Sequence, residues 1–346
     1  MKIAIHHNEG DFFSKYWIKY CEENSLSYKL VNAYSNTIVE DLENFNIFLW
    51  HHSNYDYRDA LFAKQLLFSL AKKGIKVFPD FKTNWHFDDK VGQKYLLEAI
   101  KAPLIKSYVF YTKKEALEWL DSTSLPKVFK LRGGSGSSNV KLIRTRRQGK
   151  KIINKAFGAG FEQFDRLTHL QYRFDNFKSG KENFIAVLKG LVRLFIGSEY
   201  SNSYPREKGY VYFQDFIPQN NFDTRVVVIN GKFAAAERRF VRKGDFRASG
   251  SGNFSYEGIN LDIIKCAFEV SKKLDVQSVA FDFVLDTNSK PLIVEISYGF
   301  GTKGIRGVPG YWDDKMNWYN DEFKPEEFIM EAVIQDYKLE KSKLKI

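Results

Sequence analysis

The chain has 346 residues, enough for two or three lobes around a continuous core, and its 44% hydrophobic residues are typical of a packed globular protein. The net charge of +11 favours an anionic partner: a nucleotide, an acidic or phosphorylated substrate, nucleic acid or an anionic membrane surface. Charge alone does not choose among these partners, and an ordinary basic surface explains it equally well.

Cysteine use and the N-terminus indicate the compartment. The two cysteines, Cys21 and Cys266, form no CxxC or zinc-site pattern, which favours a reducing environment. The first residues, MKIAIHHNEGDFF, lack the apolar core of a signal peptide, and no run approaches the roughly 20 apolar residues of a membrane span. We therefore expect a cytoplasmic protein without a transmembrane segment.

The first 85 residues alternate between apolar strands and amphipathic helices. The expected strands are 2–6, 28–31, 46–50 and 75–80, and the expected helices are 12–24 and 58–73. This alternation predicts a parallel sheet, which makes residues 1–85 a Rossmann-like α/β domain. No GxGxxG follows the first strand, so no dinucleotide site is expected there.

The rest of the chain reads as two α+β lobes, 86–212 and 213–346. In the first lobe we expect helices at 88–99 and 113–120 and strands at 107–111, 127–131, 139–143 and 209–217. Residues 144–205 have no readable pattern. In the second lobe we expect strands at 223–229, 232–238, 279–285 and 292–297, and helices at 259–274 and 325–338. Asn230-Gly231 is a strong two-residue hairpin signal.

A glycine-rich loop follows the strand that ends at Lys130. Glycines let backbone amides converge on phosphate oxygens, and serines add hydroxyl donors. The order of residues is not that of a Walker loop, and the loop joins two strands. A flexible polar hairpin loop is the alternative. The candidate phosphate-binding residues are Lys130, Gly133, Gly134, Ser135, Gly136 and Ser137.

Two carboxylates are predicted to face each other in the hairpin VAFDFVLDTNSKPLIVEIS. If Leu285 faces Leu292, Asp282 faces Glu295, and Ser297 shares their side of the sheet. The apolar side would then hold Phe281, Phe283, Val294 and Ile296. Opposed carboxylates repel, and a hard cation such as Mg²⁺ would remove that cost. A solvated strand face with Lys or Arg partners is the alternative.

Arginines gather on the preceding hairpin, FDTRVVVINGKFAAAERR. If Ile229 faces Lys232, Asp223 lies opposite Arg238 and Arg225 opposite Ala236. One face then carries Asp223, Arg225 and Arg238, with Arg247 a little further along the chain. Guanidinium groups bind phosphoryl groups and carboxylates in bidentate fashion. Surface salt bridging is the alternative, above all for Arg239 and Arg242.

The order of these pieces resembles the ATP-grasp superfamily from about Phe78 to Gly301. The run is FDDK, VFKLRGGSGSSNV, FQDFI, DTRVVVINGKFAAAERR, GDFRASGSGN and AFDFV…LIVEIS. It is most similar to the glutamate ligases that extend the tail of a ribosomal protein, and more distantly to D-alanine–D-alanine ligase. The resemblance implies a Rossmann-like N-terminal domain followed by two α+β lobes that clasp ATP.

The resemblance also implies roles for matching residues. Lys90 and Lys130 would hold ATP phosphates beneath the glycine loop, Asp223 would lie near the ribose, and Arg238 would stabilise an acylphosphate. Arg247 would handle substrate or transferred phosphate, with Arg225 beside it. The hinge that receives adenine would be Gln214, Asp215, Phe216 and Ile217, and the metal ligands would be Asp282, Glu295 and Ser297.

Two features depart from the family pattern. Ser297 occupies a position where the family usually has Asn, and the shorter side chain puts a second metal ion in doubt. Val140 and Gln214 are 74 positions apart, more than in compact ligases. The additional basic stretch, which includes KSGKENFIAVLKGLVRLFIGSEY, could cover the site, dock an acidic partner or touch a membrane surface. An ordinary helical insertion is the alternative.

The resulting expectation is an ATP-dependent carboxylate–amine ligase that uses one or two Mg²⁺ ions, which Mn²⁺ could replace. It would form an amide through an acylphosphate, with surface-polysaccharide or peptide modification as candidate settings. The alternatives are a kinase-like phosphotransferase and a nucleotide-binding module without turnover. Lys303, Arg306 and Trp312 are candidates for binding a small or sugar-linked carboxylate or amine. Nucleic acid is not an expected partner, and the sequence allows a homodimer.

Overall fold

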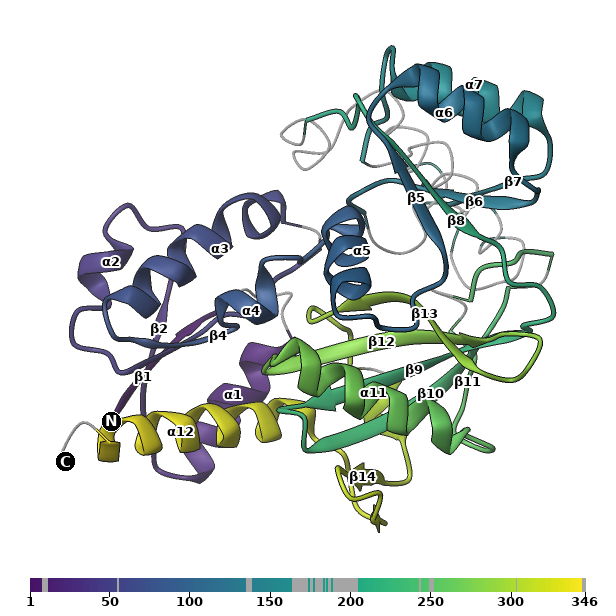
Figure 1. The fold of residues 1–346 in the computed structure, drawn as a ribbon. Helices are drawn as coiled ribbons and strands as arrows, with labels where there is room; N and C mark the ends of the chain where they lie inside the picture. The colour runs from purple at the N-terminus through teal and green to yellow at the C-terminus, as the bar shows by residue number, and fades with distance from the viewer. Residues whose placement is uncertain are drawn as a thin grey trace. The chain divides into compact units, whose positions relative to one another are not determined.

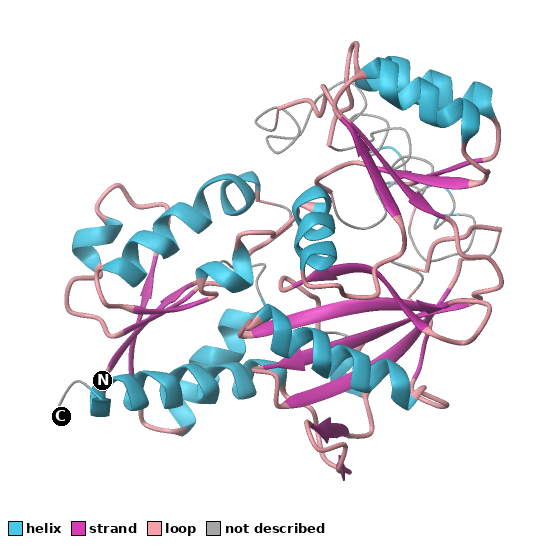
Figure 2. Ribbon diagram, viewed as in Figure 1, coloured by secondary structure: helices cyan, strands magenta, loops and turns pink. Residues whose placement is uncertain are grey.

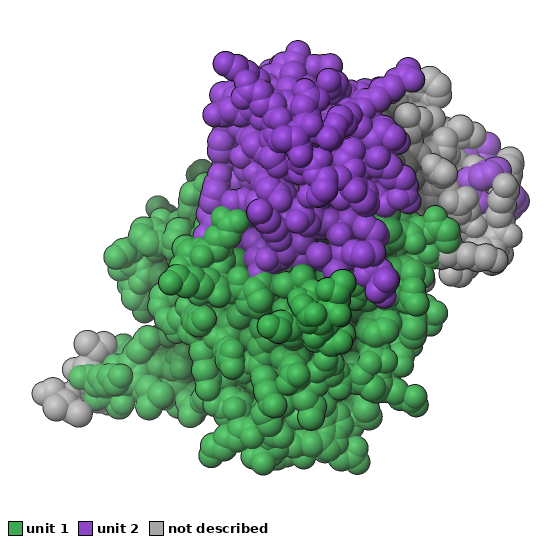
Figure 3. Space-filling view, turned by 45° about the vertical axis from the view of Figure 1, so that its right-hand side comes forward, with its two compact units in different colours: residues 1–87, 96–103, 220–346 green, residues 88–95, 104–219 purple. Residues whose placement is uncertain are grey.

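The computed structural model describes residues 1–7, 12–54, 56–134, 139–163, 205–242, 244–248, 252–302 and 304–343, with isolated positions at 174, 177, 183, 185 and 188. The chain forms two compact units, shown in separate colours in Figure 3. Unit 1 comprises residues 1–87, 96–103 and 220–346, and unit 2 comprises 88–95 and 104–219. Unit 1 thus combines the beginning and the end of the chain. The predicted division at residues 85 and 212 stays a prediction.

Unit 1 begins with the expected parallel sheet, in the order β2-β1-β3-β4 (Figure 1). Successive side chains of its strands face opposite layers. Ile3 and Ile5 pack toward helices α1 and α12, whereas Ala4 packs toward α3. The elements are β1 (Lys2–His6), α1 (Phe12–Glu23), β2 (Ser27–Val31), α2 (Ile38–Asp41), β3 (Ile47–Leu49), α3 (Tyr57–Lys72), β4 (Lys76–Phe78), α4 (Phe81–Asn84) and α12 (Pro325–Lys343).

The second sheet of unit 1 has the order β13-β12-β9-β10-β14-β15, and β11 pairs with β10. Helix α11 runs along one face of this sheet (Figure 2), and its apolar residues are buried there. The opposite face therefore remains for the charged residues described below. The elements are β9 (Phe222–Ile229), β10 (Phe233–Phe240), β11 (Phe254–Ser255), α11 (Leu261–Leu274), β12 (Ser278–Leu285), β13 (Pro291–Ser297), η1 (Ile305–Gly307), β14 (Tyr311–Asp313) and β15 (Trp318–Tyr319).

Unit 2 is built on a sheet in the order β5-β8-β6-β7, covered on one face by helices α6 and α7. Phe129 and Phe213 from the strands pack with Leu120 of α6 and Ile153 of α7. Helix α7 begins in the stretch that the sequence left unreadable, most of which lies outside the described residues. The elements are α5 (Lys90–Ala99), β5 (Ser107–Phe110), α6 (Lys113–Ser122), β6 (Lys127–Lys130), β7 (Lys141–Ile143), α7 (Arg146–Ala156) and β8 (Val211–Asp215).

No helix in the described parts of the chain is long and apolar enough to cross a membrane.

Candidate active site

The hairpin of β12 and β13 brings the predicted carboxylates together. Asp282 pairs with Glu295, and Ala280 pairs with Ser297, so both carboxylates and Ser297 lie on one face. The premise of that prediction was wrong, because Leu285 pairs with Pro291 rather than Leu292. An irregularity between Asp282 and Phe283 shifts the register by one residue and restores the predicted pairing.

The shift also changes which side chains of this hairpin reach the apolar face. Phe281, Phe283, Ile293 and Ile296 are buried, as a core face requires. Val294, which we expected in this group, is only partly buried. Val294 is the residue of β13 that has no partner in the ladder with β12, because Ile293 and Glu295 pair with adjacent residues. Because of this extra residue, Ile293 rather than Val294 lies in the core.

The register predicted for β9 and β10 was wrong by one residue. The expected turn forms, since Lys232 N donates to Ile229 O at 2.9 Å and both Asn230 and Gly231 have positive φ. The ladder, however, begins with Phe233 opposite Ile229, which leaves Lys232 as an extra residue. Asp223 therefore lies opposite Arg239 rather than Arg238, and Arg225 opposite Glu237 rather than Ala236.

The corrected register gathers charged side chains on the face opposite α11, a group we name the sheet-face cluster: Asp223, Arg225, Glu237, Arg239 and Asp282. Arg225 binds Asp282 in bidentate fashion, at 2.8 Å from Nε to Oδ1 and 3.0 Å from Nη2 to Oδ2. Arg239 binds both oxygens of Asp223 at 2.7 Å and reaches Asp282 Oδ2 at 2.7 Å. Two arginines thus join two aspartates into one network.

Burial and charge act against each other in this cluster. Burial opposes ionisation of Asp282, but Arg225 and Arg239 outweigh it and lower the pKa of the carboxyl. Burial raises the pKa of Asp223 to about 6, although Arg239 opposes the shift. Burial raises the pKa of Glu237 to about 7, with Arg225 and Arg239 again opposing. Asp282 is therefore the carboxylate most strongly held in its charged form.

Glu237 differs from its neighbours because its Oε2 is buried and makes no hydrogen bond within the described residues. The loop after β13 passes directly above it. A Cβ built on Gly304 would lie 1.9 Å from Glu237 Oε2, so the loop needs glycine at this point. Tyr256 fixes the same loop, because its hydroxyl donates to Gly304 O at 2.9 Å. Neither Glu237 nor Tyr256 was predicted as a site residue.

The donor set of Asp282, Glu295 and Ser297 fits a magnesium ion that is only partly coordinated by protein. No group of three or more His, Cys, Asp or Glu side chains that could hold a metal occurs in the described ranges. Mg²⁺ commonly takes one or two carboxylates and completes its shell with phosphate and water. Asp282 Oδ1 accepts one arginine N–H and Oδ2 accepts two, so Oδ1 keeps a lone pair with which the carboxylate can also bind a cation.

In unit 2, the base of the glycine-rich loop is bound to the FDDK segment. Gly134 N donates to Asp88 Oδ1 at 2.7 Å, and Lys90 Nζ donates to Gly134 O at 2.7 Å. A Cβ on Gly133 would lie 2.3 Å from Gln163 Nε2, which explains the glycine. Burial raises the pKa of Asp88 to about 6, with Lys90 opposing the shift. Ser135, Gly136 and Ser137 lie outside the described residues.

A second buried acid completes this base. Glu207 accepts from Arg132 Nη2 at 3.2 Å, from Gln163 Nε2 at 2.7 Å and from the Tyr210 hydroxyl at 2.8 Å. Tyr210 in turn accepts from the backbone N of Arg132 at 2.7 Å. Glu207 and Tyr210 were not predicted as site residues, because they lie more than 70 positions along the chain from Arg132 and only the fold brings them together. Their contacts fix the junction between β6 and the glycine-rich loop.

The predicted nucleotide residues Lys130 and Gln214 lie on the same face of the unit 2 sheet, opposite the helices. Lys130 pairs with Tyr212, and Val128 pairs with Gln214, whereas Phe129 and Phe213 face the helical layer. Gln214 Nε2 donates to Ser107 Oγ at 3.2 Å.

Asp215 and the two residues after it complete the predicted hinge. Lys127 Nζ binds Asp215 Oδ1 at 2.6 Å, so this side chain is engaged within the sheet. Phe216 and Ile217 follow β8 and precede the end of the unit at Gln219. The segment therefore lies near the end of unit 2, and its role as a hinge stays a prediction.

Two predicted catalytic arginines lie apart from the sheet-face cluster. Arg238 alternates with Arg239, points to the α11 side, donates to Gly258 O and lies 4.5 Å from the centroid of Phe222. Arg239 occupies the place that we expected for Arg238. Arg247 binds Asp245 within its own turn, at 2.7 Å from Nη2 to Oδ2.

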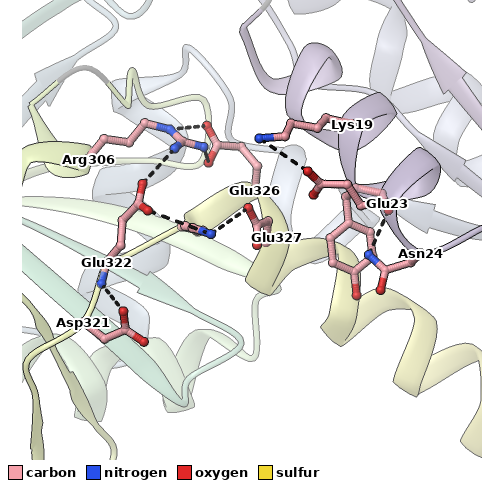
Figure 4. A network of polar contacts seen from close by, with 10 residues as sticks. Lys19, Glu23, Asn24, Arg306, Asp321, Glu322, Glu326 and Glu327 are labelled. Atoms are coloured by element: carbon pink, nitrogen blue, oxygen red, sulfur yellow. Dashed lines mark hydrogen bonds and ion pairs between the residues drawn. The ribbon is translucent and has the colours of Figure 1, made fainter.

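The predicted substrate residues are not gathered into one site. Figure 4 shows Arg306 bound to Glu326 and Glu322, at 2.8 Å and 3.5 Å. Arg306 also stacks on Tyr16 at 3.5 Å from the ring centroid, and we name these four residues the Arg306 anchor. Trp312 pairs with Ala234, on the face opposite Glu237 and Arg239. Lys303 lies outside the described residues.

Comparisons with known proteins agree with this architecture. Residues 205–311 match the family model of the RimK-like ATP-grasp domain. A RimK domain ATP-grasp protein from Sphaerobacter thermophilus has a similar fold, with a TM-score of 0.58 and 15% identity over 89% of this chain and 94% of the other. The D-cycloserine synthetase DcsG also has a similar fold, with a TM-score of 0.59 and 12% identity over 97% of this chain and 99% of the other.

The D-alanine–D-alanine ligase of Bacillus anthracis, solved with ATP, gives a TM-score of 0.55 and 13% identity over 98% of this chain and 99% of the other. No curated protein matches the chain in sequence. The fold is therefore that of the ATP-grasp proteins, as the motif order predicted. Within that superfamily, the match over 205–311 is to the RimK-like domain.

Proposed function

We propose that this protein is an ATP- and Mg²⁺-dependent ligase that joins a carboxylate to an amine through an acylphosphate. The observation that carries the proposal is the sheet-face cluster beside Glu295 and Ser297. It combines oxygen ligands for a cation with guanidinium groups that suit a transferring phosphoryl group. The ATP-grasp fold and the match to the RimK-like domain support the same chemistry.

The reaction divides into two steps that need no nucleophilic side chain. A substrate carboxylate oxygen attacks the γ-phosphorus of ATP, and ADP leaves. The amine nitrogen then attacks the acyl carbon, and inorganic phosphate leaves with that carboxylate oxygen. Asp282, Glu295 and Ser297 would hold Mg²⁺, which would supply positive charge that neutralises the phosphates.

The arginines are the residues of this face that suit the transferred phosphoryl group. Asp282 fixes Arg225, and both aspartates fix Arg239, so neither guanidinium has to reorganise during the reaction. Arg247 keeps its proposed role with substrate or transferred phosphate. In unit 2, Lys90 and Lys130 would hold the phosphates of ATP below the glycine loop, and Gln214 to Ile217 would receive the adenine.

The test uses the purified full-length chain with ATP, Mg²⁺, a panel of carboxylic acids and hydroxylamine. We expect ADP, inorganic phosphate and a hydroxamate, because hydroxylamine captures an acylphosphate. AMP with pyrophosphate would contradict the mechanism. A phosphorylated acceptor without hydroxamate would indicate a phosphotransferase, and ATP binding without ADP formation would indicate a nucleotide-binding module. Both of these outcomes would overturn the ligase proposal.

A further inference from the structure

A strongly basic segment in unit 2 plays no part in the proposed chemistry. Residues 139–161 contain seven Lys and Arg residues and no Asp or Glu. They include β7 and helix α7, which lies beside α6 in the helical layer over the sheet (Figure 1). A charge imbalance of this size within 23 residues is not needed for the fold, since the core of this unit is apolar.

Helix α7 separates its apolar and basic residues. Ile152, Ile153 and Ala156 are buried in the core, and Gly149 allows close contact with Leu120. Three exposed cations on the outward side and one just before the N-cap form a group that we name the α7 basic face: Arg144, Arg147, Lys151 and Lys155. Arg146 and Lys150 are engaged with α6, through Leu120 O at 2.7 Å and Asp121 at 3.2 Å.

The α7 basic face lacks compensation within the described structure. Arg144, Arg147 and Lys151 have no acidic partner among the described residues. Arg147, Lys151 and Lys155 succeed one another at four-residue spacing, where like charges repel. Arg147 also lies near the positive end of the helix dipole. The arrangement opposes helix stability, while the capping box of Thr145 and Gln148 supports it.

The chemistry of the face restricts its partner. In the described residues between Tyr111 and Phe174, no large apolar side chain is exposed. Protein interfaces depend on a buried aromatic or apolar centre and are depleted in Lys. Single-stranded nucleic acid is bound through aromatic stacking. Neither feature is present in the described residues 112–163, whereas a diffuse negative surface needs only clustered cations.

We propose that the α7 basic face holds the protein against an anionic lipid surface. The attachment is electrostatic adsorption, because α7 has no exposed apolar side to insert between lipids. Each Lys or Arg near such a surface strengthens binding by about fivefold, and the effect disappears beyond a Debye length of about 10 Å at 0.1 M salt. Three cations on one short helix and a fourth just before it therefore suffice for binding that salt reverses.

The test measures co-sedimentation of the full-length chain with vesicles. Wild-type protein should bind equimolar phosphatidylcholine and phosphatidylglycerol, should not bind pure phosphatidylcholine, and should dissociate at about 1 M NaCl, where the Debye length is about 3 Å. Replacing Arg144, Arg147 and Lys151 together with Gln should weaken binding roughly 100-fold, from three factors of about five. A matched triple change to Gln at Lys338, Lys341 and Lys343 on α12 removes the same charge elsewhere and should have little effect.

An equal loss in the two triple variants would overturn the proposal, because net charge would then explain binding. Absence of wild-type binding to anionic vesicles would also overturn it. A third arm uses duplex DNA at the same ionic strength. Tighter binding of DNA than of vesicles, lost in the α7 variant, would show that the face serves nucleic acid instead. Circular dichroism melting of both variants confirms that each is folded.

Discussion

Two groups of charged residues in unit 1 use the same chemistry in different ways. In the Arg306 anchor, one arginine binds the buried carboxylate of Glu326 and stacks on Tyr16. In the sheet-face cluster, Arg225 and Arg239 meet Asp223, Asp282 and Glu237, and Glu237 retains an unpartnered buried oxygen. Both carboxylates of the anchor have a cationic partner, whereas Glu237 in the cluster has an oxygen without a hydrogen bond in the described residues.

The difference indicates which cluster is structural. Glu326 lies in the first turn of α12, and its backbone oxygen accepts from Trp17 Nε1 at 3.1 Å, so the anchor ties the helix to the body of unit 1. The sheet-face cluster ties together only strands that are already paired by their ladders. A surplus of carboxylates on an already stable sheet suggests a site for a cation and phosphate.

The largest effect should come from Glu295→Gln. We expect ADP formation to fall on the order of a thousandfold, because a carboxylate ligand beside developing phosphate charge is lost. Glu295 is only partly buried, so the melting temperature should change little. Asp282→Asn is a less clean test, because it also disturbs the bonds to Arg225 and Arg239. Full activity in the Glu295 variant would remove the metal site from the account.

Arg306→Met should separate the two clusters most clearly. It leaves the fully buried carboxylate of Glu326 without its main partner, and we expect a loss of roughly 3 kcal/mol in unfolding free energy. Turnover measured well below the melting temperature should stay near the wild-type rate. Arg239→Met, the counterpart in the sheet-face cluster, should lower both stability and turnover. A selective rise in the Michaelis constant for an acceptor in the Arg306 variant would restore its predicted substrate role.

The sequence predicted the order of most strands and helices because their apolar periods are clear. It could not fix the register of β10, where Ala234, Ala235 and Ala236 give neither face an apolar preference. With Arg238 and Arg239 adjacent, a one-residue shift exchanged one arginine for the other. The carboxylate pair was predicted correctly only because the irregularity in β13 offset the wrong pairing of Leu285.

Contacts between residues far apart in the chain could not be predicted from the local sequence pattern. Arg306 and Glu326 are 20 residues apart, and nothing in either neighbourhood predicts that a helix N-terminus will receive the guanidinium. Glu207 and Asp88 are separated by more than a hundred positions and meet around the same loop base only through the fold. Their charges indicate polar surroundings in sequence, whereas the structure buries both.

Lys130→Met tests whether a buried charge in unit 2 binds ATP or only stabilises the fold. The affinity for ATP should fall roughly ten- to a hundredfold, since a charge-assisted contact contributes about 1.5–3 kcal/mol. Adenosine affinity, measured by calorimetry in parallel, should change little because adenosine lacks phosphates. Equal losses for the two ligands would instead indicate a folding defect around this buried lysine.

Glu237→Gln tests, through the pH dependence of stability, whether Glu237 is a buried acid that the arginines do not neutralise. Burial raises the pKa of Glu237 from 4.5 to about 7, so the folded state keeps a proton that the unfolded state releases, and stability falls as pH rises through this window. Gln carries no titrating proton. From pH 5 to pH 8 the variant should therefore gain roughly 2–3 kcal/mol in unfolding free energy relative to wild type, measured by urea denaturation.

The matched change in the anchor, Glu326→Gln, should lower stability at both pH values because it leaves Arg306 without its buried counter-charge. A pH-independent difference between wild type and the Glu237 variant would mean that Glu237 is ionised throughout. The sheet-face cluster would then contain no surplus acid of the kind inferred here.

The acylphosphate intermediate is tested most directly by tracing an oxygen atom from the substrate carboxylate to the released phosphate. Carboxylic acids that the ADP screen identifies as substrates are labelled with ¹⁸O in the carboxyl group and incubated with ATP, Mg²⁺ and an amine. Phosphorus NMR then examines the released phosphate. We predict one ¹⁸O atom in inorganic phosphate for each amide formed, because the carboxylate oxygen leaves with the phosphoryl group. Amide formation with unlabelled phosphate would contradict an acylphosphate and with it the proposed mechanism.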